Sequence, residues 1–253
     1  MIRTSARGVV RRVRNGLNKR LARQVLPLFL RPVDSDLGLE PLGDGDGAWV
    51  VPTRIIQPDW VCYCIGVGEN ASFDVALTQR FGCQVFSFDP TPRSIEYMRT
   101  LPYDRQRLRF MPVGVWNDDV DLRFYAPANR RHANWSVVDL HGTGDYFTAT
   151  CKRLRTIMRE QGHSRIDLLK MDIEGSWYEV LKELLRENIR VSVLCVEFDS
   201  PTSLSKLRWA VRELSAIGMC LVHFERENFV FVDRAMISPL QDRERHLPCK
   251  ANA

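Results

Sequence analysis

Short apolar runs of strand length alternate with amphipathic stretches of helix length through the middle of this chain. The clearest pair of runs is Val61–Ile65 and Val85–Phe88. Between them lie Gly66, Gly68 and a stretch whose apolar residues recur at helical spacing as far as Phe81. A strand, a glycine turn, a helix and a second strand in this order are typical of a β-α-β unit that binds a nucleoside.

The same criteria predict further elements on both sides of this unit. Strands are predicted at Trp49–Ile56, Phe110–Val115, Asp121–Tyr125, the apolar run from Ile166 that ends at Asp172, and Val191–Phe198. Helices are predicted at Tyr146–Glu160, Trp177–Glu187 and Ser203–Ile217, and an antiparallel hairpin at Met219–Phe224 and Phe229–Val232. The pattern therefore predicts an α/β fold with a mostly parallel sheet, helices on both faces and a C-terminal antiparallel hairpin.

Three of the predicted strands end in acidic residues. These are Asp89, Asp172 with Glu174 close behind it, and Glu197 with Asp199. Because the carboxyl ends of parallel strands line the ligand crevice of such a sheet, we expect these acids to meet at one edge. Asp89 is placed to accept hydrogen bonds from ribose hydroxyls.

Two classes of cofactor fit the glycine turn. Gly66-Val67-Gly68-Glu69-Asn70-Ala71 matches the G-x-G-x-x-G/A pattern of dinucleotide sites, with Asp89 at the spacing of its acidic partner. Sites for S-adenosylmethionine also use a glycine turn after the first strand and an acid after the second. Glu69 would repel a pyrophosphate and attract the positive end of S-adenosylmethionine, which favours the second class without excluding a nicotinamide oxidoreductase.

Several blocks of the chain resemble those of FkbM-type methyltransferases. The blocks are Gly66-Val67-Gly68-Glu69-Asn70 with Ser72-Phe73-Asp74, Phe88-Asp89-Pro90-Thr91-Pro92, Pro112-Val113-Gly114-Val115-Trp116 and Leu169-Lys170-Met171-Asp172-Ile173-Glu174-Gly175. The resemblance implies a Rossmann-like class I methyltransferase sheet, S-adenosyl-L-methionine as the cofactor and, for many members, O-methylation. The cofactor-binding residues expected from it are Gly66, Gly68, Glu69, Asn70, Asp89, Pro90, Val113, Gly114 and Asp172. Cys64 departs from the class I pattern, because many such enzymes carry an acid there; Glu69 is the candidate to replace it.

Methyl transfer from a sulfonium is an in-line substitution in which the protein aligns the acceptor and removes its proton. Glu174 is the predicted base or substrate orienter, and Asp172 is predicted to lie near the cofactor. In the structural alternative, Asp172 caps the next helix while Glu174 pairs with Lys170 or an arginine. His132 is the predicted third catalytic candidate, and His141 could serve as the base in its place.

The acceptor is expected to be a hydroxyl of a small molecule, a glycan or a lipid-linked molecule. Residues 126–145 lack periodicity, and an irregular insertion of this length is usually functional or disordered. Trp135 and Trp177 either line an acceptor pocket or belong to the core. No cluster of His, Cys or acidic residues has the spacing of a metal site.

Composition is ordinary for a globular protein, with 45% hydrophobic and 26% charged residues among 253. Four of the seven cysteines, Cys62, Cys64, Cys195 and Cys220, fall in predicted strands. Buried reduced thiols are therefore expected, which favours a cytoplasmic location. The sequence shows no secretory signal and no apolar run of membrane-spanning length.

Charge is distributed unevenly along the chain. Residues 1–33 contain nine Lys or Arg and no acid, which leaves a net charge of −4 (+5 less the nine) for residues 34–253. The basic segment also carries a Val/Leu stripe near helical spacing. Such a segment contacts an anionic membrane, serves as a targeting peptide rich in Arg and poor in acids, or packs as a helix on the domain. No nucleic-acid partner is expected, because no aromatic-basic platform accompanies the charge.

These features divide the chain into four parts. Residues 1–33 are the basic amphipathic extension, 34–48 an acidic Gly-rich linker, 49–237 the methyltransferase domain and 238–253 a polar tail. A non-catalytic module that binds a membrane or partner through the extension is the alternative to the enzyme, and Cys64 is the residue that motivates it.

Overall fold

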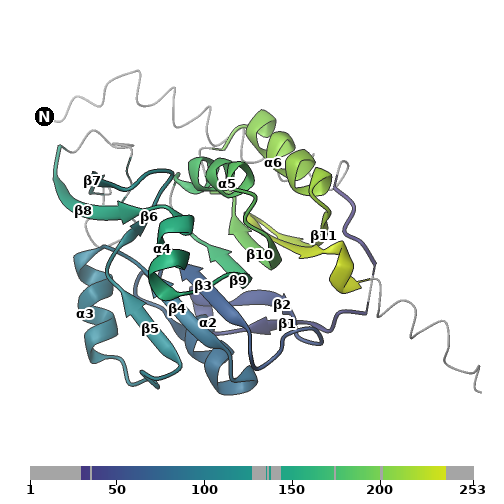
Figure 1. Ribbon diagram of the computed structural model, residues 1–253, viewed down its shortest axis with the longest axis horizontal. Coiled ribbons are helices and arrows are strands. Elements are labelled where there is room, and N and C mark those ends of the chain that lie inside the picture. Colours follow the sequence, from purple (N-terminus) through teal and green to yellow (C-terminus); the bar gives the residue numbers. More distant parts are fainter. Residues whose placement is uncertain are drawn as a thin grey trace, which may run out of the picture.

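The computed structural model describes residues 30–34, 36–126, 135, 137, 144–173, 175–199 and 202–237. Its main sheet is built from β3 (Val61–Ile65), β4 (Gln84–Phe88), β5 (Leu108–Met111), β9 (Ile166–Met171), β10 (Val191–Glu197), β11 (Met219–Glu225) and β12 (Asn228–Asp233). The seven strands lie in the order β11-β12-β10-β9-β3-β4-β5 (Figure 1).

Strand directions confirm the predicted α/β sheet. The neighbours β10, β9, β3, β4 and β5 are all parallel, whereas β12 runs antiparallel to both β10 and β11. From β3 the chain steps outward to β4 and β5, and then returns to β9 on the other side of β3. Open α/β sheets bind ligands at such a reversal, at the carboxyl ends of the strands.

Helices cover both faces of this sheet, as predicted. One face is covered by α4 (Leu154–Gln161), α5 (Trp177–Arg186) and α6 (Leu204–Ala216). The other is covered by α2 (Ser72–Ala76), its π-helical continuation η2 (Leu77–Phe81), α3 (Pro92–Thr100) and the hairpin of β1 (Leu39–Leu42) and β2 (Trp49–Pro52). Strand alternation separates two cores: Tyr63 and Ile65 face the first layer, and Cys62 and Cys64 the second.

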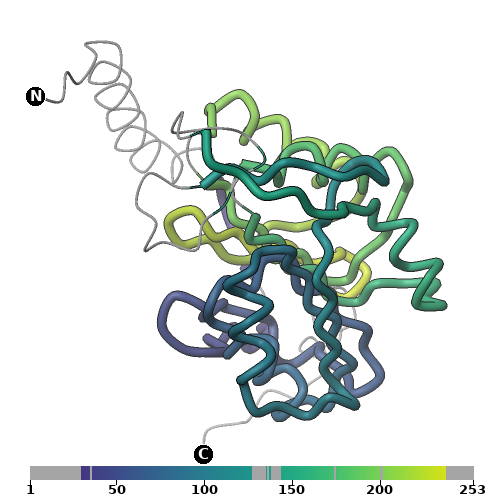
Figure 2. Tube along the Cα trace, turned by 90° about the vertical axis from the view of Figure 1, so that its left-hand side faces the viewer, coloured from purple at the N-terminus to yellow at the C-terminus, as the bar shows by residue number. Residues whose placement is uncertain are grey.

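The segment predicted as a linker is instead part of the domain. β1 pairs with β2 along its whole length, and a 3-10 turn, η1 (Gly45–Gly47), joins the two strands. Leu37 and Leu42 are buried in the core beneath the sheet. Figure 2 shows this hairpin in purple beside the layer that contains α2. The Gly and Asp content predicts loop structure, but these two leucines hold the segment against the domain.

The stretch predicted as one helix from Tyr146 begins as a strand. Only its second half is helical, as α4, because β8 (Tyr146–Lys152) pairs antiparallel with β7 (Val120–Tyr125). Exposed and less exposed residues alternate along β8, which is the period of a strand. With β6 (Gly114–Val115), these strands form a separate three-stranded sheet in the order β6-β8-β7, at the upper left of Figure 1.

Some predictions fall on residues outside the described part. They concern most of the basic segment, the polar tail, Glu174, His132 and His141. The last residues of the predicted extension do contact the domain, because Leu30 packs on the core and Val33 N donates to Leu221 O at 2.8 Å. All six cysteines in the described residues are buried free thiols. No helix in this part is long and apolar enough to cross a membrane.

Candidate active site

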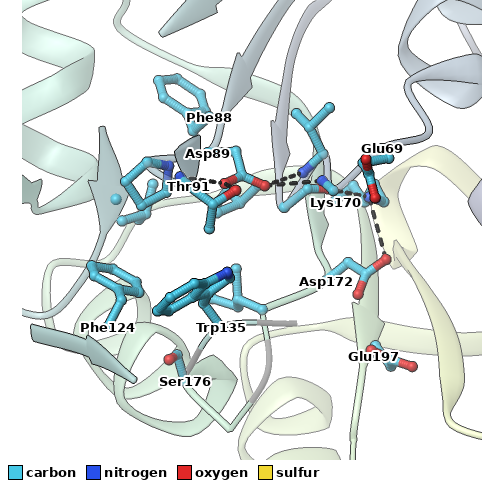
Figure 3. A pocket seen from close by; sticks show the side chains of 18 of the residues that line it. Glu69, Phe88, Asp89, Thr91, Phe124, Trp135, Lys170, Asp172, Ser176 and Glu197 are labelled. Atoms are coloured by element: carbon cyan, nitrogen blue, oxygen red, sulfur yellow. Dashed lines mark hydrogen bonds and ion pairs between the residues drawn. The ribbon is translucent and has the colours of Figure 1, made fainter. Parts of the chain in front are cut away.

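A cavity of about 490 Å³ opens at the carboxyl ends of the central strands (Figure 3). Its walls come from the turn after β3, the residues after β4 and β9, the end of β10, and β7 of the side sheet. The volume lies within the range of about 300–1,000 Å³ that is common for small-molecule and cofactor sites. The cavity therefore occupies the place where the reversal of strand order predicts a ligand.

Gly66 opens the turn after β3 and is locked against the neighbouring strand. Its φ is +86°, and a Cβ on it would lie 1.8 Å from the carbonyl oxygen of Asp172. Gly68, with φ +58°, also adopts the left-handed conformation, but a Cβ there would meet no atom within 4 Å. The first glycine thus permits close packing of the two strands, and the second leaves space on the cavity side.

Asp89 holds the glycine turn from the end of the next strand. Its Oδ2 accepts hydrogen bonds from the backbone N–H groups of Val67 at 3.0 Å and Gly68 at 2.9 Å. Its Oδ1 accepts from Thr91 N at 2.9 Å and Thr91 Oγ1 at 2.7 Å. A carboxylate offers about four acceptor positions, so a ribose hydroxyl would have to share or replace one of these donors.

Glu69 and Asn70 lie at the mouth of the turn and contact other layers of the fold. Glu69 forms an ion pair of 2.6 Å with Arg93 of α3. The Asn70 amide donates to Asp44 O at 3.0 Å and to Asp46 Oδ1 at 2.9 Å, which joins the turn to the β1–β2 connection. Glu69 was expected to receive the positive end of the cofactor, and in this structure its carboxylate is shared with Arg93.

The acid after β9 is coupled to the glycine turn through Lys170. The Lys170 ammonium donates to Gly66 O at 2.7 Å and lies 3.5 Å from Asp172 Oδ2. Lys170 is only 3% exposed. Burial alone would lower the pKa of Lys170, but the nearby carboxylates of Asp172 and Asp74 raise it above its usual value. The lysine therefore carries a positive charge beside the cavity.

The helix cap expected of Asp172 is formed differently. The Ser176 side chain forms no capping hydrogen bond to α5 within the part of the chain that the structure describes, and the Gly175 N–H just before it donates to Asp199 Oδ2 at 2.6 Å. Asp172 faces the cavity together with Glu197 from the end of β10. The strand-end acids Asp89, Asp172 and Glu197 thus meet at one edge, as the sequence predicts.

An aromatic wall closes the opposite side of the cavity. Phe124 of β7 and Trp135 both line it and lie side by side in Figure 3. Behind them, Phe147 of β8 stacks on Phe124 at 5.2 Å and meets Trp135 edge-on at 5.0 Å between ring centroids. Trp177, the other tryptophan considered for this role, is a core residue that is 2% exposed and packs edge-on against Phe198.

The structure brings together nearly all the residues predicted to bind the cofactor. Those that line the cavity are Gly66, Gly68, Glu69, Asn70, Asp89, Pro90, Gly114 and Asp172. Val113 does not line it and lies in the turn between β5 and β6. Gly114 is required for packing as well, because a Cβ there would lie 2.5 Å from Cys151 Sγ. Sequence reasoning missed Lys170 and Phe124 as cavity residues; strand alternation at β7 was the signal for Phe124.

The charge of the lining discriminates between the two classes of cofactor. Its charged side chains are Asp46, Glu69, Asp89, Asp172, Glu197 and Lys170. Five acids against one base suit a cationic group and oppose a pyrophosphate. The lining therefore favours a ligand that carries positive charge at this place. Among the described residues, no three His, Cys, Asp or Glu side chains are grouped to hold a metal ion.

Comparison with known proteins agrees with this interpretation. The Methyltransferase FkbM domain matches residues 61–229. Two curated relatives are the probable methyltransferase-like protein 24 of Homo sapiens, 25% identical over 164 residues, and that of Rattus norvegicus, 26% identical over 163 residues. Each alignment covers 64% of this chain and 37% of the relative, so the chain spans little more than a third of their length.

Two solved structures align with the chain at low sequence identity. The Methanococcus jannaschii fibrillarin pre-rRNA processing protein is 10% identical, with a TM-score of 0.41 over 79% of this chain and 85% of that one. The precorrin-6y C5,15-methyltransferase of Geobacter metallireducens GS-15 is 12% identical, with a TM-score of 0.36 over 79% and 96%.

Proposed function

This chain belongs to the FkbM methyltransferase family, and from that premise we propose that it transfers a methyl group from S-adenosyl-L-methionine to a hydroxyl of a small molecule, a glycan or a lipid-linked acceptor. The observation that carries the proposal is the acidic cavity at the reversal point of the sheet, bordered by the glycine turn on one side and the aromatic wall on the other.

The residues of the glycine turn and its neighbours would hold the cofactor. The backbone at Gly68 leaves room for a nucleoside, and Asp89 keeps the turn from Gly66 to Gly68 in place. Asp172 and Glu197 supply negative charge on the same side. When bound, S-adenosyl-L-methionine supplies an electrophilic methyl on a cationic sulfur, and these carboxylates would favour binding of that charge.

Phe124 and Trp135 form the side on which an acceptor would lie. Their faces are apolar, whereas the opposite wall carries the carboxylates. An acceptor resting on this wall would direct a hydroxyl across the cavity toward the acids, with few alternative orientations. We propose that this division of the cavity into an apolar side and a charged side aligns the acceptor oxygen.

The acceptor hydroxyl must lose its proton as its oxygen bonds to the methyl carbon. Glu174 remains the proposed base and lies outside the described residues, directly after Ile173 of the cavity lining. Glu174→Gln keeps the shape and removes the proton acceptor, so turnover should fall by about 10²-fold or more with cofactor affinity nearly unchanged. Unchanged turnover would show that Glu174 is not the base, and His132 and His141 would be tested next.

Binding calorimetry tests the cofactor directly. The purified chain should bind S-adenosylmethionine and S-adenosylhomocysteine and should not bind NAD, because the acidic lining opposes a pyrophosphate. Trp135→Ala is the matched variant for the acceptor side, and it should leave S-adenosylhomocysteine affinity unchanged. Binding of NAD alone would overturn the proposal.

We also propose a cytoplasmic, peripheral location in which residues 1–33 contact an anionic membrane. The nine cations of this segment support it, since each Lys or Arg near such a surface adds up to about 1 kcal/mol at low salt. Full-length protein should co-sediment with phosphatidylserine-containing vesicles, and added salt should release the protein from the vesicles. Reversing the charge of Arg11, Arg12 and Arg14 to Glu should abolish sedimentation; equal sedimentation would contradict the idea.

A further inference from the structure

Lys170 occupies a position that a sheet interior rarely gives to a charged side chain. It lies in the central strand β9, where its Cα partners are Cys64 on β3 and Cys195 on β10. All three residues lie within the sheet, and the two cysteines are completely buried. Burying an ammonium costs several kcal/mol unless polar partners replace the lost water. The contacts of Lys170 must therefore offset this cost.

The partners of Lys170 come from three separate elements. Its Nζ donates to Gly66 O, in the turn after β3, and pairs with Asp172, after β9. Behind the sheet, the Asp74 carboxylate of α2 attracts the same ammonium. Asp74 is 2% exposed and accepts a hydrogen bond from Ser87 Oγ on β4. Burial raises the pKa of Asp74, and the Lys170 ammonium and the Ser87 hydroxyl oppose this. One side chain therefore connects both walls of the crevice to a buried carboxyl group.

This arrangement balances charge beside the cavity. Asp172 faces the cavity with a side chain that is 33% exposed, whereas Lys170 is almost inaccessible. The ammonium offsets part of the negative field that Asp172 would otherwise exert on a ligand. A cationic cofactor and its neutral product differ by one charge at the sulfur, so the net field at this place sets how strongly the site prefers one to the other.

We propose that Lys170 is a positioning residue that fixes the Gly66 turn relative to Asp172 and limits the preference of the site for the cationic cofactor over the neutral product. The inference rests on the proposed function, because it concerns binding of S-adenosylmethionine and S-adenosylhomocysteine. Loss of the ammonium would leave the Asp172 carboxylate uncompensated beside the cavity, so the cationic ligand would gain relative to the neutral one.

Calorimetry of three Lys170 variants separates this charge effect from simple loss of structure. Lys170→Gln removes the charge but retains an amide that can donate to Gly66 O, and Lys170→Met removes both; Lys170→Arg keeps the charge. The ratio of the dissociation constants, S-adenosylhomocysteine over S-adenosylmethionine, should rise on the order of tenfold in the Gln and Met variants. In the Arg variant the ratio should remain that of the wild type.

Cys195→Ala provides the matched structural control. Cys195 is the Cα partner of Lys170 on β10, is fully buried and does not line the cavity. Its truncation should lower the melting temperature without changing the ratio. Equal weakening of both ligands in Lys170→Gln would overturn the inference while leaving the proposed function intact. A wild-type protein that binds neither ligand would overturn both the inference and the proposed function. If Lys170→Met fails to fold, Lys170→Gln still tests the charge effect.

Discussion

Gly66 and Gly68 occupy one turn but are required for different reasons. Both have a positive φ, which costs a residue with a Cβ about 1–2 kcal/mol. Only at Gly66 would the Cβ also collide with backbone, at 1.8 Å from Asp172 O. The carbonyl belongs to a strand-end segment held by the sheet, and therefore cannot move aside cheaply.

The two alanine substitutions should consequently differ in stability. We expect Gly66→Ala to lower the free energy of unfolding by about 3–5 kcal/mol or to prevent folding, since strain and collision add. Gly68→Ala should cost about 1–2 kcal/mol, the conformational part alone. Urea denaturation of both variants without ligand measures the difference. Similar losses in the two proteins would show that collision at Asp172 is not limiting.

Asp89 is expected to act on the turn even when no cofactor is bound. Asp89→Asn replaces one acceptor oxygen with an NH₂ group that faces donors, so two of the four hydrogen bonds are lost. The ligand-free protein should lose about 1–3 kcal/mol of stability, measured by thermal or urea unfolding. Asp46→Asn alters an exposed carboxylate of the same cavity and should change stability by less than about 0.5 kcal/mol. If Asp89 served the ribose alone, both variants would match the wild type without ligand.

At the scale of elements, α4 depends on an acid outside the helix. Asp119 Oδ1 accepts a hydrogen bond from Arg153 N at 2.9 Å, where α4 begins, and its Oδ2 accepts from Thr156 Oγ1 at 2.8 Å and from the Arg153 guanidinium. Partial burial opposes ionisation, but these hydrogen bonds from Arg153 and Thr156 together hold the pKa of Asp119 at about 2. The residue thus acts as the N-terminal cap that α4 lacks in its own sequence.

Removing this cap should destabilise the protein above the usual pKa of an aspartate. Asp119→Ala should lower the free energy of unfolding by about 1–2 kcal/mol at pH 7. Because the folded pKa is depressed, the difference from wild type should shrink as the pH falls toward 2. Asp118→Ala is the control, since that exposed carboxylate accepts from Asp119 N rather than from α4. Equal losses in both variants at pH 7 would contradict the capping role.

Prediction of helices and strands succeeded where the apolar residues followed a single spacing. It failed where a strand spacing and a helix spacing adjoin. The runs at β3, β4 and β10 are predominantly apolar and mostly buried, and they identify parallel strands of the sheet interior directly. Tyr146–Glu160 contains a strand and a helix joined at Arg153, and a helical stripe can be drawn through both. The linker prediction failed because composition outweighed two leucines whose partners lie far away in the sequence.

At the scale of the molecule, topology assembles a site that the sequence predicts only in part. The acids at three strand ends predicted where the cavity lies, since the carboxyl ends of parallel strands meet at one edge of the sheet. The sequence did not predict Lys170 as a cavity residue, because its role depends on Asp74 in the layer behind the sheet. The sequence did not predict the aromatic wall either, because the wall depends on a second sheet whose strand pairing is set by contacts between distant residues. Local alternation can place Phe124 on one face of a strand, but it does not indicate which distant residues that face contacts.

The stability of the whole molecule should decrease between mildly acidic and neutral pH because of one glutamate. Glu183 of α5 is 2% exposed, and within the described residues neither of its carboxylate oxygens has a hydrogen-bond partner. Burial, assisted by Glu187 and opposed by Arg186, Arg153 and Arg155, raises its pKa to about 7. In the unfolded chain it ionises near 4.5, so between these values the folded state binds more protons and stability falls as the pH rises.

Glu183→Gln should therefore stabilise the protein, and most strongly above neutrality. A neutral side chain of the same shape removes the cost of burying the charge, on the order of 2–3 kcal/mol at pH 8, and leaves stability at pH 5 nearly unchanged. Urea denaturation from pH 5 to pH 8 measures both. Glu179→Gln alters a more exposed carboxylate of the same helix, paired with Lys182, and should keep the wild-type pH dependence. If the free energies of unfolding of wild type and Glu183→Gln changed in parallel with pH, Glu183 would not be the cause of the pH dependence.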